Sequence, residues 1–235
     1  MARTYRLGAE GSGLQITLLH KPFEPRSFSG EPPGVLIFPL PYHQTLDGKK
    51  ATAIKHWVER GGGLLILGYY AADSHHGSNV SRLTREWGIT FNDDLVMPPG
   101  ASELDTRRQA FGSEEALGCS LEAKGSTHPL VFGVNRVVLL SAASLDVRHA
   151  MPRDFEWKTS PASEIWRPEG PKDPKGMRPI IEQWVKSGQE SAVVFTSFRY
   201  GRGKVAVIGT WKVVTLPHGD NKRFIENVID WIRPR

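Results

Sequence analysis

The sequence predicts an α/β protein whose sheet consists mostly of parallel strands. The first observation is the stretch Asp47 to Gly68, which has the pattern of a capped amphipathic helix followed by glycines and a short buried strand. The second is the apolar run Val35 to Leu40, which completes a strand, helix and strand unit with a right-handed crossover. The third is a pair of apolar runs near the carboxyl terminus, followed by another amphipathic helix.

The central stretch can be justified residue by residue. Asp47 is a good N-cap, because its carboxylate can accept hydrogen bonds from free backbone N–H groups of the first turn. Gly61 to Gly63 end the helix, since glycine takes the left-handed conformation of a helix C-terminus without strain. Leu64 to Leu67 are too few for a helix and do not alternate, which indicates a buried parallel strand. The stripe facing the sheet should comprise Ala51, Ile54, Trp57 and Val58, with Lys49, Lys50, Lys55, Glu59 and Arg60 largely on the other side.

Elements next to this unit are less strongly marked. Leu14 to Leu19 predicts a strand ahead of it. Beyond it, Ser78 or Asn79 is expected to cap a short helix, and Ile89 to Val96 to form a strand. The polar stretch Pro98 to Gly118 is expected to be a loop with at most one short strand.

The second half of the chain begins with Val134 to Ser141, a predicted strand that is expected to pair as a hairpin with Ala143 to Val147. Residues 151–176 are rich in Pro, Lys, Glu and Asp, and are interpreted as an insertion outside the core. Trp157 and Trp166 are expected to pin this insertion to the body, in preference to forming a stacking surface for a ligand.

Two strands and a helix are expected at the carboxyl terminus. Ala192 to Phe198 and Lys204 to Gly209 are joined by RYGRG, whose glycines permit a tight antiparallel hairpin at a sheet edge. Asp220 is expected to cap the final helix. The apolar face of that helix should comprise Phe224, Ile225, Val228, Ile229 and Ile232.

Composition bounds the class of protein. The 235 residues are 39% hydrophobic and 23% charged, as in an ordinary globular protein, and a single domain over residues 1–235 is expected. The 30 basic and 25 acidic residues are mixed along the chain, so the net charge of +5 does not favour a nucleic-acid partner. Cys119 is the only cysteine, which excludes an internal disulfide and fits a reducing compartment. No segment approaches the roughly 20 apolar residues of a membrane span, so a cytoplasmic location is expected.

Several segments, taken in order, resemble one family. They are HWVERGGGLLILG, HPLVFGV, and YGRGKVAVIG with DNKRFIENVIDWI. Together they are similar to the class I glutamine-amidotransferase-like domains that lack amidotransferase chemistry. This group contains the domain shared by gliding-motility and intraflagellar-transport proteins and several bacterial domains of unknown function. The resemblance implies a flavodoxin-like three-layer α/β/α sandwich.

The resemblance also allows a test for catalysis. In active amidotransferases the strand that corresponds to Leu64 to Leu67 ends in a sharp turn carrying a nucleophilic cysteine. Tyr70, or Tyr69 in a register shifted by one, stands there in this sequence, and a phenol with a pKa near 10 is a poor acyl acceptor. Cys119 is far from that turn, and Asp220 after His218 is better explained as a helix cap. A domain without a catalytic nucleophile is therefore expected.

Histidines in predicted loops give a weaker alternative. His43, His75 and His218 all follow strand ends, and imidazoles that converge can hold a metal ion. The sequence has no HxH or HxxxH spacing, so exposed loop histidines are the favoured interpretation, with no metal and no cofactor.

The leading hypothesis is a noncatalytic module that binds a partner protein or a small ligand at the carboxyl ends of its strands. Tyr69, Tyr70 and Trp211 are expected to be exposed on that face. A hydrolase that uses a histidine or a metal-bound water is the first alternative. A nucleic-acid-associated module that uses Arg199, Arg202, Lys204 and the loop Lys172 to Arg178 is the second. The expected ligand-binding residues are Tyr69, Tyr70, Asp73, His75, His76 and Trp211.

Overall fold

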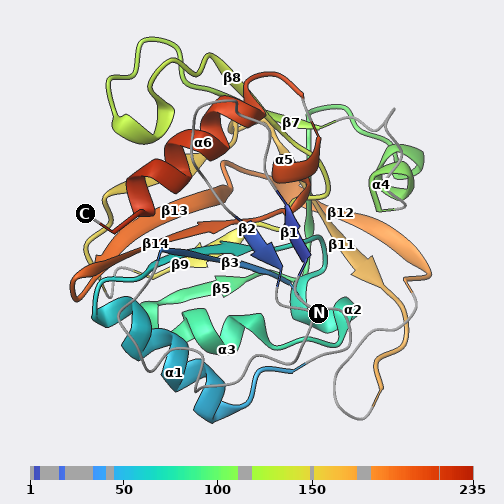
Figure 1. The fold of residues 1–235 in the computed structure, drawn as a ribbon. Coiled ribbons are helices and arrows are strands. Elements are labelled where there is room, and N and C mark those ends of the chain that lie inside the picture. The colour runs from blue at the N-terminus through green and yellow to red at the C-terminus, as the bar shows by residue number, and fades with distance from the viewer. Residues whose placement is uncertain are drawn as a thin grey trace.

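The computed structural model confirms an α/β protein (Figure 1). It describes residues 3–5, 16–18, 34–40, 45–110, 118–148, 151–173, 181–216 and 218–234. The first described strands, β1 (Arg3–Tyr5) and β2 (Ile16–Leu18), form a separate antiparallel pair, and β2 lies within the strand expected at Leu14 to Leu19.

A five-stranded sheet in the order β10-β13-β14-β4-β3 forms the centre of the molecule. Strand β4 pairs in parallel with both β3 and β14, whereas β13 pairs antiparallel with both β14 and β10. The sheet is therefore mixed. Only β13 runs against the other four strands, but two of the four pairings are antiparallel, so the expectation of a mostly parallel sheet is confirmed only in part. The carboxyl-terminal hairpin is antiparallel as predicted, but it is not at the edge, because β10 extends the sheet beyond β13. The strands are β3 (Val35–Pro39), β4 (Gly63–Leu67), β10 (Phe155–Lys158), β13 (Val193–Tyr200) and β14 (Gly203–Ile208).

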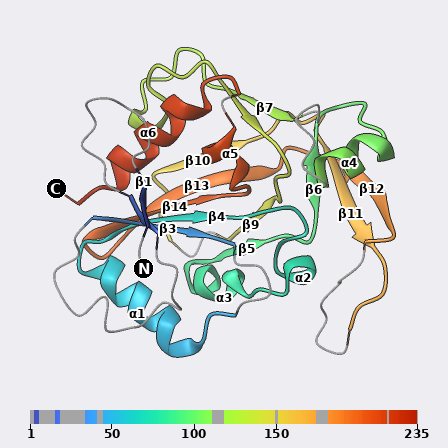
Figure 2. The same cartoon turned by 45° about the vertical axis from the view of Figure 1, so that its right-hand side comes forward.

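Helices cover both faces of this sheet. Helix α1 (Gly48–Glu59) lies on one face and α6 (Asn221–Ile232) on the other, and both contact β14 (Figures 1 and 2). Strand β4 is buried throughout, as predicted, and its side chains alternate between the two cores. Leu64 and Ile66 join the core under α1, and Leu65 and Leu67 join the core under α6.

The prediction for α1 is confirmed in most details. Asp47 is its N-cap and accepts a hydrogen bond from the backbone N–H of Lys50 at 2.8 Å. Trp57 is buried against the sheet, and Gly61 after the helix has a φ of 119°. Lys55 is an exception to the expected polar face, because it is buried and forms an ion pair with Glu86.

The region after β4 is more divided than predicted. A short helix α2 (Ala72–His76) precedes α3 (Val80–Thr84) and the 3-10 turn η2 (Arg85–Trp87). The single strand expected at Ile89 to Val96 is two strands, β5 and β6, which belong to different sheets. Their bounds are β5 (Ile89–Phe91) and β6 (Leu95–Met97).

Two expectations in the middle of the chain are wrong. The stretch expected to be a loop from Pro98 to Gly118 contains α4 (Glu103–Ala110). Strand β8 (Arg136–Leu139) pairs with β7 (Cys119–Glu122), and β9 (Leu145–Val147) pairs with β5, so the expected hairpin between Val134 to Ser141 and Ala143 to Val147 does not form. The 3-10 turn η3 (Pro129–Val131) contacts α6.

The segment 151–176 is part of the body where the structure describes it. Its strand β10 is in the central sheet, and β11 (Glu164–Glu169) pairs with β6 and with β12 (Gln183–Gln189). Trp157 and Trp166 are buried in the two cores, so these tryptophans anchor the segment as expected, but the segment is not outside the core. No helix among the described residues is long and apolar enough to cross a bilayer.

Candidate functional site

The turn after β4 holds the residues on which the sequence prediction concentrated. The turn begins at Gly68. A larger residue does not fit at this position, because a Cβ would lie 2.3 Å from the ring of Phe91. Ala71 and Ala72 then have positive φ angles of 50° and 38°, the left-handed region that alanine rarely adopts. Backbone hydrogen bonds hold this conformation, since Tyr70 N–H donates to Ser141 O at 3.0 Å and Ala71 N–H donates to Asp94 O at 2.8 Å.

Tyr69 or Tyr70 was expected to stand where active amidotransferases carry their nucleophile. The left-handed residues of this turn are Ala71 and Ala72, which directly follow these tyrosines. Cys119 is buried, and burial raises the pKa of its thiol to about 12, so the thiol stays protonated at neutral pH.

Aromatic and imidazole rings gather at this end of the sheet. We call this group the strand-end ring cluster; it comprises Tyr69, Tyr70, His75, His76, Trp184 and Trp211. Tyr69 and Tyr70 have ring centroids 4.4 Å apart, and Trp211 lies 5.5 Å from Tyr69. The sequence prediction therefore identified five residues that do come together, from the turn after β4 and the turn after β14.

Exposure within the strand-end ring cluster differs from the expectation. Tyr69 and Tyr70 are only 5% and 7% exposed, so the prediction that these tyrosines are open to solvent is wrong. Trp184 of β12 packs against Tyr70 at 5.8 Å between ring centroids, which explains part of this burial. His75 and Trp211 are half-buried and keep some accessible surface.

His76 and Asp73 support the backbone here. His76 is fully buried, and its Nε2 is 2.9 Å from the carbonyl oxygen of Tyr70. The carboxylate of Asp73 accepts hydrogen bonds from the N–H groups of Val80 and Ser81, at 2.7 and 2.9 Å. Asn79 is the N-cap residue of α3, as one of the two expected caps, but its side chain makes no capping hydrogen bond, and Asp73 accepts those hydrogen bonds instead.

A loop that the sequence did not single out connects these elements. Ala142 O accepts from Val96 N–H at 2.9 Å, and Ala143 N–H donates to Gly209 O at 3.0 Å. Ser144 donates through its N–H and its hydroxyl to the buried carboxylate of Asp94. Burial raises the pKa of Asp94 to about 6, against the lowering effect of the two hydrogen bonds from Ser144. Residues 141–144 thus tie together the ends of β4, β6 and β14.

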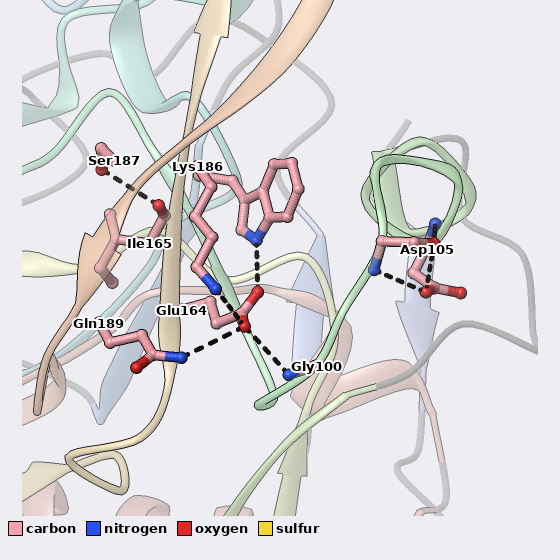
Figure 3. Close-up of polar contacts among 9 residues, drawn as sticks. Gly100, Asp105, Glu164, Ile165, Lys186, Ser187 and Gln189 are labelled. Carbon is pink, nitrogen blue, oxygen red and sulfur yellow. Dashed lines mark hydrogen bonds and ion pairs between the residues drawn. The ribbon is translucent and has the colours of Figure 1, made fainter.

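A second buried carboxylate fixes the β11–β12 hairpin beside the cluster (Figure 3). Glu164 accepts from Lys186 Nζ at 2.6 Å, from Gly100 N–H at 3.0 Å and from Trp166 Nε1 at 3.1 Å. Burial alone would raise the pKa of Glu164, but these hydrogen bonds and the lysine charge lower it below its usual value. The ion pair between Glu164 and Lys186 therefore holds in place the hairpin that carries Trp184.

The remaining candidates lie elsewhere. Asp220 is the N-cap residue of α6, as expected, but its carboxylate makes no hydrogen bond to that helix. It accepts instead from the N–H groups of Asn135 and Arg136, so it holds β8. His43 lies outside the described residues. Among the residues that are described, no group of three or more His, Cys, Asp and Glu side chains is arranged to hold a metal ion.

Three of the basic residues that were considered for nucleic acid have partners within the protein. Arg199 forms an ion pair with Asp154 at 3.6 Å, and Lys204 Nζ donates to Trp231 O at 2.6 Å. Lys172 lies 3.9 Å from Asp93. Arg202 is exposed in the β13–β14 turn, and residues 174–178 of the expected basic loop lie outside the described residues.

A shallow hollow of about 330 Å³ lies away from the strand-end ring cluster and shares no residue with it. It lies between the end of β7 and the edge of β10. Its lining comprises Glu122, Ala123, Lys124, Gly125, Ser126, Val131, Phe155 and Trp157.

Comparison with known proteins supports the fold alone. No protein-family model matches the sequence, and no curated protein matches it. Among solved structures, the mmIFT52 N-terminal domain matches with a TM-score of 0.64 and 15% identity, over 91% of this chain and 82% of that one. The cytoplasmic protein STM3548 from Salmonella typhimurium matches with a TM-score of 0.49 and 15% identity, over 86% of this chain and 72% of that one. At 15% identity the first match shows a similar fold, which is consistent with the fold of the group that the sequence resembles.

Proposed function

We propose that this chain is a noncatalytic binding module of the amidotransferase-like class, with a flavodoxin-like sandwich as its architecture. It binds a partner protein or a small ligand at the carboxyl ends of β4 and β14. The observation that carries the proposal is the turn after β4, where alanines occupy the left-handed positions and a cluster of rings stands beside them. The cytoplasmic location expected from the sequence belongs to the same proposal.

The position of the cluster supports binding. Ligands of open α/β sheets bind outside the carboxyl ends of the strands, and the chain places six rings there. Aromatic side chains dominate the energetics of many interfaces, because they bury a large area and lose little rotamer entropy. His75 and Trp211 supply the accessible part of this surface, and Tyr69 and Tyr70 support them from the interior.

The strain at Ala71 and Ala72 also supports a functional role for the turn. Non-glycine residues in the left-handed region each cost about 1 to 3 kcal/mol, and such residues gather at ligand sites and active sites. Ser141, whose carbonyl accepts from Tyr70, has a φ of 54° as well. Three strained residues at one end of the sheet therefore indicate a conformation selected for something besides stability.

The test is a capture experiment with matched baits. Wild-type protein, the double variant His75→Ala/Trp211→Ala and the control Arg202→Ala are immobilised and exposed to extract from the cells that produce the protein. The proposal expects one or more proteins or metabolites that the wild type and the control retain and the double variant loses. Equal retention by all three folded baits would contradict it. Release of ammonia from glutamine, measured on the same samples, is expected to stay at the level of buffer.

A further inference from the structure

Lys212 is a buried lysine at the same end of the sheet, and the sequence analysis did not single it out. It begins the short helix α5 (Lys212–Thr215), just beyond β14. Its backbone N–H donates to Thr210 Oγ at 3.1 Å, and that hydroxyl donates to Leu140 O at 2.6 Å, so the position of its backbone is fixed. The residue is only 6% exposed.

Its amino group has no acceptor among the described residues. Lys212 Nζ is buried and makes no hydrogen bond to them. It lies over the ring of Tyr69, at 5.6 Å from the ring centroid. Burial lowers the pKa of Lys212, and no carboxylate opposes that effect.

Comparison with other lysines shows that this arrangement is exceptional in the described part of the chain. Lys55, which is as buried as Lys212, forms an ion pair with Glu86. The amino groups of Lys186 and Lys204 each have an oxygen acceptor at 2.6 Å. A buried ammonium group without such an acceptor is unfavourable, and attraction to one aromatic ring offsets only part of the desolvation.

We propose that Lys212 recognises an oxyanion, a carboxylate or a phosphate group, of the ligand or partner that binds at the strand-end ring cluster. The proposal rests on the proposed binding function and names the charge of what is bound. The anion supplies the acceptor that the amino group lacks, and the rings of Tyr69 and Trp211 contact the part of the ligand next to it. Because Nζ is covered, binding requires a side chain to move, and Trp211 is half-buried and next in sequence.

The test is thermal unfolding in sodium phosphate, in sodium acetate and in sodium chloride, at one pH and one ionic strength. The proteins are the wild type, Lys212→Met, Trp211→Ala and Lys124→Met, which removes an exposed lysine as a control. At about ten times the dissociation constant, phosphate or acetate is expected to raise the melting temperature of the wild type and the control by about 3 to 6 °C over chloride. Lys212→Met should lose this increase. In chloride it should melt no lower than the wild type, because methionine keeps the buried stem and removes the unpaired charge.

The two anions distinguish a phosphate group from a carboxylate, and the variants separate this inference from the proposed function. If neither anion raises the wild-type melting temperature, the inference is overturned. If Lys212→Met keeps the increase while Trp211→Ala loses it, the strand-end site binds anions without Lys212, so the inference fails and the proposed function stands. A Lys212→Met protein that melts several degrees lower in chloride would also contradict the inference, since the amino group would then be stabilising without a ligand.

Discussion

Glycines allow close contacts at both ends of the central sheet, but the two ends differ in what accompanies those contacts. At the amino ends of β4 and β14, glycines allow backbones to touch. A Cβ on Gly63 would lie 2.2 Å from Ile232 O, and one on Gly203 would lie 2.1 Å from Val58 O. Gly62 is equally constrained, because its Cβ would lie 2.5 Å from the ring of Trp57. The amino end of the sheet is therefore packed too closely for larger residues at these three positions.

The carboxyl ends carry groups that packing alone does not explain. Ala71, Ala72 and Ser141 have left-handed backbone conformations there, and Asp94 and Lys212 are buried. Unfavourable conformations and buried charges are retained in proteins mainly where function requires them. We therefore propose that one end of the sheet serves stability and the other serves binding, and each prediction below tests one side of that division.

The largest expected effect is at the amino end. Trp57→Ala should lower the free energy of unfolding by about 3 to 5 kcal/mol, because the indole is 2% exposed and its loss leaves a cavity beside Gly62 and the sheet. Urea unfolding of this variant, with His56→Ala on the exposed side of α1 as the control, measures the effect. A loss below about 1 kcal/mol would mean that α1 does not depend on this contact.

The next effect is a pH dependence at the carboxyl end. The folded carboxyl of Asp94 has a pKa of about 6, against an ordinary 3.8, so the folded state holds this proton more tightly than the unfolded state. Its contribution to stability is complete below about pH 4 and is lost as the pH rises through about 6, a change of at most about 3 kcal/mol.

Asp94→Asn should remove this component from the pH profile. Asp47 and Asp220 have lowered pKa values and act in the opposite sense, so the informative quantity is the difference between the two proteins. Urea unfolding at intervals from pH 4 to pH 8 measures it. Parallel profiles for the wild type and Asp94→Asn would show that burial does not raise the pKa of Asp94.

A smaller effect is expected for Asp73. Asp73→Ala removes the acceptor for Val80 N–H and Ser81 N–H, and loss of such a cap costs about 0.5 to 2 kcal/mol. Asp73 is thus expected to stabilise α3 without contacting the ligand. Unchanged stability together with weaker binding of a captured partner would return Asp73 to the ligand-binding set that the sequence suggested.

Local patterns were sufficient for one half of the fold. The helix that begins after Asp47 is marked by a cap, an apolar stripe and the glycines that end it, and the strand Leu64 to Leu67 by an apolar run. All of these signals lie within one short segment of the sequence. The final helix was equally readable, because its five apolar positions fall on one side and all five are buried. The ring cluster was found because its members follow strand ends, which is a rule of topology.

The features that the sequence did not predict depend on contacts between residues far apart in the chain. Asp73 caps a helix that begins seven residues later, and Asp220 bonds to a strand more than eighty residues earlier, so neither partner could be read from a local window. Phe155 to Lys158 is a strand with charged residues at alternate positions, which resembles a polar loop until β13 is placed beside it. The burial of Tyr70 depends in part on Trp184, more than a hundred residues away.

The most direct test of the division between the two ends is the affinity of a captured partner, measured by titration calorimetry. His75→Ala/Trp211→Ala changes the carboxyl end, and Arg202→Ala changes the exposed turn at the amino end. The account predicts that the double variant, still folded by circular dichroism, binds about tenfold more weakly or worse, because truncated aromatic contacts often lose more than 1.4 kcal/mol. The control should bind as the wild type does. Equal affinities for all three proteins, or a loss confined to Arg202→Ala, would contradict the assignment of binding to the carboxyl end.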